Sequence, residues 1–288
     1  MTGLARAFQA LRFALDVPRK MQLDQVIAIL ESIAPLDFAE PWDNVGLLLE
    51  PPGLDHVRHI LLTIDLTEPV LEEALEKEVT LIVAYHPPIF SGLKRLSVRV
   101  SQQRLLLRAA QLGIAIYSPH TALDAARGGV NDWLTEPLEP AHSIPITIPA
   151  GTETSDAVGA GRRVELASAM PLSRLIERIK RHLGLAQVRL ASSRAHGEGA
   201  LIRSAAVCAG AGGGLFAPLS GVDLYLTGEM RHHDILRKLE QGASVILCDH
   251  SNTERGFLPV LARRLCADAR EEIAVSVSKA DAEPLSIV

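Results

Sequence analysis

Histidines and carboxylates follow several predicted strands of this 288-residue chain, and these are the residues that could perform chemistry. Five of the ten histidines come shortly after an apolar segment typical of a buried strand, namely His86, His120, His232, His233 and His250. Asp124 and Glu254 each follow one of these histidines by four residues. Imidazole and carboxylate groups together suit zinc, iron or manganese. The pattern therefore indicates a metal site.

Each of the two four-residue pairs also allows a purely structural interpretation. Ser251-x-x-Glu254 and Thr121-x-x-Asp124 both fit a capping box, in which the two side chains satisfy backbone groups at the start of a helix. Either pair alone leaves the choice between a cap and a metal site open. The repetition of the pattern at successive strand ends favours the metal site.

The elements that must position these side chains alternate between strand and helix. We predict strands at 57–66, 80–85, 114–117, 163–167, 187–191, 204–209, 223–227, 245–248 and 273–277. We predict helices at 22–33, 68–77, 101–112, 172–183 and 254–267, with one that ends near residue 240. Such alternation is typical of an α/β fold with mostly parallel or mixed sheets. Because ligands bind at the carboxyl ends of parallel strands, Glu229 and His233 are expected to join the other groups.

Composition shifts divide the chain into two similar α/β lobes. Residues 139–161 are rich in Pro, Gly, Thr and Ser and are expected to be a linker. The first lobe is then 21–138 and the second 162–280, with an N-terminal extension at 1–20 and a tail at 281–288. The glycine-rich segment 210–214 fits no nucleotide-binding motif and is expected to be a structural turn.

The overall composition argues against several classes of partner. A formal net charge of −5 and 4% aromatic residues give no support for nucleic acid or an anionic membrane as partner. No apolar run approaches the roughly 18 residues of a membrane span. Three cysteines without a CxxC motif suit a reducing, cytoplasmic compartment. The basic, amphipathic first twenty residues leave organelle targeting open.

Five segments, taken in order, resemble one known family. They are PWDNVGL at 41–47, YHPPIF at 85–90, HTALD at 120–124, TGE at 227–229 with His233, and HSNTE at 250–254. Together they resemble the Nif-three-like family, whose members are often labelled GTP cyclohydrolase I type 2. The likeness covers roughly residues 22–280. It implies two α/β lobes with a metal site in the cleft between them, two divalent metal ions per subunit and a homo-hexamer.

The resemblance also assigns roles to single residues. His86, Asp124, His250 and Glu254 match metal-ligand positions of the family, while His120, Glu229 and His233 match polar positions that line the site. Tyr85 stands where the family commonly has a first histidine. A phenol is a poor ligand at neutral pH, so one metal is expected to bind more weakly or to recruit His120.

Three functions are compatible with these observations. The first is a metal-dependent hydrolase that acts on a small molecule, such as a nucleotide-like compound or a cyclic amide or amidine, with Glu229 or His233 moving protons. The second is a metal-binding or metal-trafficking protein without turnover, and the third is a protein-interaction scaffold. The sequence identifies neither the substrate nor the metal.

Overall fold

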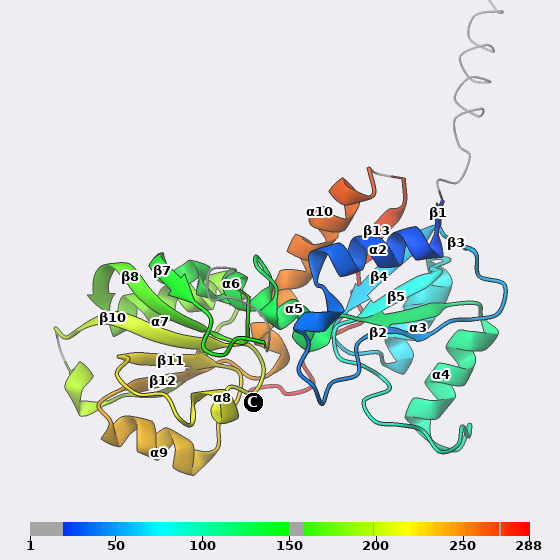
Figure 1. Cartoon of the computed structure of the whole chain (residues 1–288). Helices are drawn as coiled ribbons and strands as arrows, with labels where there is room; N and C mark the ends of the chain where they lie inside the picture. The colour runs from blue at the N-terminus through cyan, green and yellow to red at the C-terminus, as the bar shows by residue number, and fades with distance from the viewer. Residues whose placement is uncertain (1–19, 150–157, 198, 271) are drawn as a thin grey trace, which may run out of the picture.

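The chain forms two mixed β-sheets that lie side by side, with helices between and around them (Figure 1). This computed structural model describes residues 20–149, 158–197, 199–270 and 272–288. The expected N-terminal extension therefore lies almost wholly outside the described residues. Among the described residues, no helix has the length and apolarity needed to cross a membrane.

The first sheet has five strands in the order β13-β4-β5-β6-β2. Their bounds are Ala274–Val277 (β13), His59–Thr63 (β4), Leu81–Ala84 (β5), Ala115–Ser118 (β6) and Gly46–Leu49 (β2). Strands β13, β4, β5 and β6 are parallel, and β2 is antiparallel to β6. A separate antiparallel pair joins β1 (Met21–Gln22) to β3 (His56–Val57).

The second sheet has six strands in the order β7-β8-β10-β11-β12-β9. Their bounds are Pro140–Ile144 (β7), Arg162–Pro171 (β8), Leu201–Cys208 (β10), Leu224–Thr227 (β11), Ser244–Leu247 (β12) and Arg189–Ala191 (β9). Strands β10, β11 and β12 are parallel, and the other neighbours are antiparallel. The predicted α/β class with mixed sheets is confirmed.

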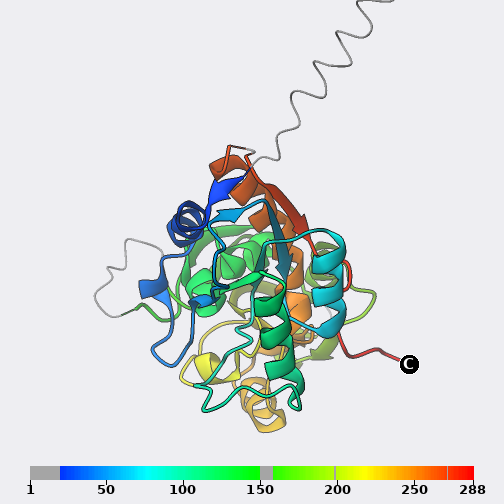
Figure 2. The same cartoon turned by 90° about the vertical axis from the view of Figure 1, so that its right-hand side faces the viewer.

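Alternating residues of the strands face two different apolar layers, because side chains point to opposite faces at every step. In β4, Ile60 and Leu62 face the main core, while Leu61 faces a smaller cluster under two helices. Those helices are α3 (Glu68–Glu76) and α4 (Ser101–Gln111), which Figure 2 shows nearest the viewer. The outer face of the second sheet packs against α8 (Gly213–Phe216) and α9 (His232–Glu240).

The main core is shared by both sheets. It contains Ile60 and Val83 of the first sheet and Val207 and Ile246 of the second. Five helices contribute to it: α2 (Leu23–Ile33), α5 (His120–Ala125), α6 (Val130–Thr135), α7 (Leu172–Leu183) and α10 (Leu258–Asp268). One continuous apolar layer therefore fixes the strand ends of one sheet relative to those of the other.

The sheets group two segments differently from the expected division into lobes and linker. Strand β13 was expected in the second lobe, but it pairs in parallel with β4 at the edge of the first sheet. The described part of the expected linker contains β7, which is antiparallel to β8. Proline and glycine content could not show that Pro140–Ile144 extends a sheet, and residues 150–157 of the expected linker lie outside the described residues. Short 3₁₀ turns complete the fold at Leu36–Phe38, Glu136–Leu138, Arg194–His196, Ser251–Thr253 and Arg255–Phe257.

Candidate metal centre

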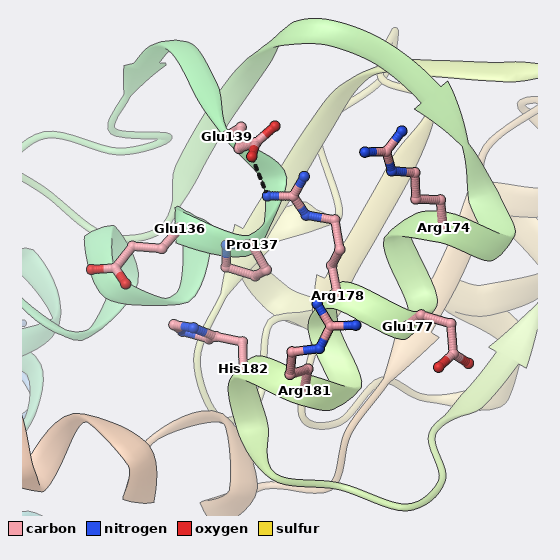
Figure 3. Close-up of a pocket in the computed structure, with 8 residues that line it drawn as sticks. All are labelled: Glu136, Pro137, Glu139, Arg174, Glu177, Arg178, Arg181 and His182. Carbon is pink, nitrogen blue, oxygen red and sulfur yellow. Dashed lines mark ion pairs between the residues drawn. The ribbon is translucent and has the colours of Figure 1, made fainter.

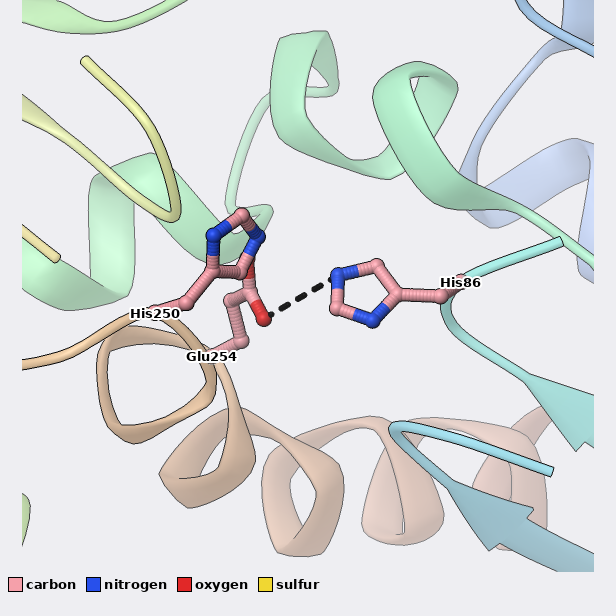
Figure 4. A group of neighbouring side chains, drawn as sticks. All are labelled: His86, His250 and Glu254. Atoms are coloured by element: carbon pink, nitrogen blue, oxygen red, sulfur yellow. Dashed lines mark ion pairs between the residues drawn. The ribbon is translucent and has the colours of Figure 1, made fainter. Parts of the chain in front are cut away.

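Three side chains from the two sheets meet at one point. His86 follows β5 of the first sheet, whereas His250 and Glu254 follow β12 of the second. One ligand atom from each of the three lies within 4.8 Å of the other two. In Figure 4, His250 and Glu254 come from one segment and His86 points at them from the opposite side. Residues 164 positions apart therefore form a single cluster, the metal cluster of this description.

The donor atoms of the metal cluster fit a divalent cation. Glu254 Oε2 lies 3.4 Å from His86 Nε2, and Glu254 Oε1 lies 3.5 Å from His250 Nε2. Donors bound tetrahedrally at about 2.1 Å from one ion would be separated by about 3.4 Å. His86 Nε2 and Glu254 Oε2 are also buried and have no hydrogen-bond partner among the described residues. Buried polar atoms are normally satisfied, so these two atoms suit a bound cation.

A carboxylate lies next to the outer nitrogen of each histidine. Asp65 Oδ1 lies 2.9 Å from His86 Nδ1, and Glu229 Oε1 lies 3.5 Å from His250 Nδ1. A carboxylate at Nδ1 orients the ring and leaves Nε2 as the donor to a metal. The hydrogen bond from His86 also lowers the pKa of Asp65.

The surroundings of His86 favour its protonated form. Burial lowers the pKa of His86, but the hydrogen bond to Asp65 and the charge of Glu254 outweigh burial and raise that pKa to about 10. The anionic field that retains a proton on His86 would also attract a cation. A metal ion and the proton therefore compete for the same nitrogen.

Tyr85 donates a hydrogen bond from its hydroxyl to Asp124. Burial raises the pKa of Tyr85 well above its ordinary value, and the nearby carboxylates of Asp124 and Glu254 add to this effect. Burial also raises the pKa of Asp124, to about 6, although the Tyr85 hydroxyl opposes that shift. Tyr85 is thus a neutral phenol that orients Asp124. Cys208 lines the same cavity, and burial raises the pKa of its thiol in the same way.

His120 is oriented by Asp43, which belongs to the PWDNVGL segment at 41–47. Its Nδ1 lies 2.8 Å from Oδ1 of Asp43, whose side chain is fully buried. The other oxygen of Asp43 accepts a hydrogen bond from the backbone N–H of Thr121 at 3.1 Å. The ring centroids of His120 and His86 are 5.5 Å apart. His120 therefore lies beside the metal cluster, with its orientation fixed by Asp43.

Two glycines allow the backbone to approach the metal cluster closely. A Cβ atom on Gly210 would lie 2.7 Å from Glu254 Oε1 and 2.9 Å from His250 Nε2. Gly210 also has a φ of +61°, which favours glycine. A Cβ on Gly228 would lie 2.6 Å from the carbonyl oxygen of Gly210. The glycine-rich segment 210–214, expected to be a structural turn, thus also forms a wall of the site.

The metal cluster opens into a cavity of about 860 Å³. Its lining includes His86, His120, Asp124, Glu229, His250 and Glu254, so six of the seven predicted site residues reach one cavity. His233 does not, because α9 presents it to solvent with its ring 5.4 Å from that of His232. Asp124 and His120 line the cavity but lie outside the three-residue cluster.

A family model described as Duf34/NIF3 (NGG1p interacting factor 3) matches residues 21–284 of the chain. The chain belongs to the NIF3 family. It is 43% identical over 279 residues to NIF3-like protein 1 of Drosophila melanogaster, covering 93% of this chain and 89% of the relative. It is 40% identical over 283 residues to NGG1-interacting factor 3 of Saccharomyces cerevisiae, covering 93% and 98%.

Solved structures show the same fold. A Bacillus cereus protein related to NIF3 superposes with a TM-score of 0.81 at 19% identity, covering 93% of this chain and 99% of that one. Reduced HcgD from Methanocaldococcus jannaschii superposes with a TM-score of 0.74 at 21% identity, covering 90% and 98%. The resemblance inferred from the five motifs to the NIF3 family is therefore confirmed.

The alternative interpretation of the two four-residue pairs as capping boxes is wrong. Within the described residues, the turn at Ser251 and the helix at His120 have no side-chain cap hydrogen bond. Thr121 is engaged by Asp43, and Ser251 Oγ donates to Glu283 at 2.5 Å. The predicted helix from Glu254 begins only at Leu258, after two 3₁₀ turns.

The sequence patterns did not predict that the C-terminal tail forms part of the site. Asp281 Oδ2 accepts hydrogen bonds from the backbone N–H of Ile64 at 2.7 Å, and it pairs with Arg255 at 2.5 Å. Glu283 lines the cavity together with Pro284 and Leu285. Asp65 was missed because the predicted strand ran past Thr63, where β4 ends. An acidic residue directly after a strand was the available signal for Asp65.

A second cavity of about 660 Å³ lies between α7 and the turn at Glu136–Leu138 (Figure 3). Arg174, Arg178 and Arg181 project into it from α7, and Glu139 pairs with Arg178 at 2.6 Å. His182 is the one histidine in its described lining, and its ring stacks on Trp133 at 4.4 Å. Among the described residues, the one group that could hold a metal ion lies at His86, His250 and Glu254 and not in this cavity.

Proposed function

We propose that the protein is a metal-dependent hydrolase whose cation is held by His86, His250 and Glu254. One observation carries this proposal: three metal-ligand atoms lie within 4.8 Å of one another. Both His86 and Glu254 also have a buried side-chain atom without a hydrogen-bond partner among the described residues. Asp124 and His120 line the same cavity and are the groups available to a second divalent ion. Zinc, iron and manganese all accept this donor set.

Each polar group would have a separate task. When bound, a divalent cation supplies Lewis-acid chemistry, because it lowers the pKa of water and polarises a carbonyl or phosphoryl oxygen. Glu229 orients His250 and is 56% exposed, so it can accept a proton within the cavity. His233 lies outside the cavity in the chain and has no such role in this proposal. The substrate class we propose is a small cyclic amide, amidine or nucleotide-like compound.

Elemental analysis of the purified protein, before and after chelation, together with a screen of hydrolase substrates tests this proposal. We expect bound metal, and turnover that disappears on chelation and returns with one of the three metals. Glu229→Gln should then lower the turnover by about 10²–10⁴-fold while the metal content stays unchanged. Turnover that persists in fully chelated protein would contradict the proposal.

Metal trafficking without turnover is the second candidate. The observation that favours it is the state of Tyr85, which bonds to Asp124 and leaves only three side chains in the metal cluster. Fewer protein ligands favour faster metal release. Rapid metal exchange with a chelator, combined with no hydrolysis of any compound in the screen, would support this function. Assembly into a homo-hexamer is a further part of the proposal, which analytical ultracentrifugation tests.

A further inference from the structure

Two aromatic rings stand at the mouth of the metal-site cavity. Trp42 and Phe90 line it, their ring centroids are 5.8 Å apart, and the side chains are 58% and 54% exposed. Asn44 Nδ2 donates to the carbonyl oxygen of Ile89 at 2.5 Å, which ties the two loops that carry these rings together. Exposed, fixed aromatic rings beside polar groups are typical of a site for a planar ligand.

The charge of the cavity is strongly acidic. Its described lining holds six carboxylates and no lysine or arginine; the acids are Glu40, Asp65, Asp124, Glu229, Glu254 and Glu283. Two bound divalent cations would add four positive charges, so the six carboxylates would still outnumber them. The adjoining cavity contains Arg231, but Glu229 and Asp234 accompany it. A ligand with several negative charges would therefore meet repulsion on entry.

Two N–H groups of the glycine-rich segment are not available to bind a phosphate. The N–H of Gly210 donates to Thr253 Oγ1 at 2.8 Å, and the N–H of Gly212 donates to Thr227 Oγ1 at 2.9 Å. A phosphate-binding loop needs free N–H groups that point at the ligand. Here two of these donors are already used by buried threonines.

From these three observations we infer that the cavity takes a neutral or cationic planar heterocycle and discriminates against its phosphorylated forms. The ring lies against Trp42 and Phe90 at the mouth, and its amide or amidine group points inward to the metal cluster. The reaction at this group rests on the proposed function. The class of ligand follows independently from the aromatic rings and the carboxylates. A nucleoside triphosphate is then a poor ligand.

Binding of guanosine, GMP and GTP to the full-length, zinc-loaded chain tests the inference, because the three share one base and sugar. Isothermal titration calorimetry would give the affinities, with the zinc content of the protein measured after each titration. We expect guanosine to bind at least about tenfold more tightly than GTP, with GMP between them. GTP binding as tightly as guanosine, or no binding of guanosine, would overturn the inference.

Two variants separate the contributions of ring and charge. Trp42→Ala should weaken guanosine binding by about 5–150-fold, which corresponds to the about 1–3 kcal/mol that base–aromatic stacking contributes, and should leave the zinc content unchanged. Glu40→Lys should improve the binding of GTP and not of guanosine. Equal responses of both ligands to Glu40→Lys would argue against electrostatic exclusion. Hydrolysis of GTP with tight GTP binding would retain the proposed hydrolase and refute this inference alone.

Discussion

His86 shows how neighbouring carboxylates set the chemistry of one side chain. With its pKa raised to about 10, His86 carries a proton at neutral pH in the metal-free protein. Its ion pairs with Asp65 and Glu254 stabilise the metal-free fold fully below about pH 6.5, the ordinary histidine value. This contribution is lost as the pH rises through about 10.

Metal uptake is therefore expected to release the proton of His86. Between pH 6 and 8, binding of Zn²⁺ should release about one proton from this residue, and a further fraction from Asp124 if that group also binds, because its pKa is raised to about 6. The affinity should rise with pH over this range. Calorimetry in two buffers of different ionisation enthalpy measures the release. Binding without proton release at pH 7 would show that His86 is not a ligand.

Tyr85→Phe distinguishes a phenol ligand from a phenol that only donates a hydrogen bond. Because the Tyr85 hydroxyl bonds to Asp124, its removal should leave metal bound to the His86, His250 and Glu254 cluster. The Zn²⁺ affinity of this cluster should change less than about tenfold. Competition with a chromogenic chelator gives the affinity. Loss of all bound metal in Tyr85→Phe would make the hydroxyl a required ligand.

Gly210→Ala tests the close approach of backbone and ligands. The added methyl would meet Glu254 Oε1 and His250 Nε2 at under 3 Å, so both donors must move. We expect the Zn²⁺ affinity to fall by at least about tenfold. Gly214→Ala is the matched control, since a Cβ there has no described atom within 4 Å. Equal metal affinity in both variants would contradict the packing described.

At the scale of elements, local patterns predicted most strands and helices, and the site follows from where the strands end. Residues 245–248 and 80–85 have the continuous apolar character of buried parallel strands, and the structure confirms both. The partners of Asp43, Asp65 and Glu283 could not be predicted, because they lie 77, 21 and 32 residues away along the chain. No local pattern encodes such a pairing.

Glu73 of α3 fixes the segment that follows β13. Its carboxylate accepts hydrogen bonds from Ser278 Oγ at 2.5 Å and from the N–H of Lys279 and of Ala280 at 3.0 Å. Lys77 Nζ donates to it as well, at 2.6 Å. Burial raises the pKa of Glu73, but these hydrogen bonds outweigh it and lower that pKa to about 2. The carboxylate therefore stabilises the fold above about pH 4.5 and loses this effect as the pH falls through 2.

Glu73→Gln should accordingly destabilise the protein by about 1.5–3 kcal/mol at pH 7. The difference from the unaltered chain should shrink as the pH falls from about 4.5 to about 2, because over this range the unfolded chain binds a proton on Glu73 that the native carboxylate does not bind. Urea unfolding at several pH values measures it. Glu76→Gln, on the exposed face of the same helix, is the control and should change stability little. A pH-independent difference for Glu73→Gln would rule out the charge as its cause.

At the scale of the whole molecule, the two sheets behave as one body because they share the main core. The sequence predicted two units from a change in composition near residue 139, yet the last strand returns to the first sheet. A chain that leaves a sheet and later returns to it looks, residue by residue, like one that continues into a new lobe. Topology of this kind depends on long-range pairing and could not be predicted from local patterns.

The shared core predicts cooperative unfolding that metal shifts to higher temperature. His86 comes from one sheet and His250 from the other, so a bound cation links them. At a free Zn²⁺ concentration 100 times the Kd, binding should stabilise the fold by about 2.7 kcal/mol. Calorimetry should show one transition whose Tm falls on chelation. Two separate transitions, of which only one responds to metal, would contradict a common body.

The most direct test of the metal cluster is the Zn²⁺ affinity of single-histidine variants of the chelator-treated, full-length chain. His86→Ala and His250→Ala should each weaken binding by at least about 100-fold while circular dichroism shows an unchanged fold. His142→Ala, on the exposed strand β7, should bind as the unaltered chain does. If all three variants bound Zn²⁺ equally well, His86 and His250 would not hold a common cation, and the proposed metal centre would be wrong.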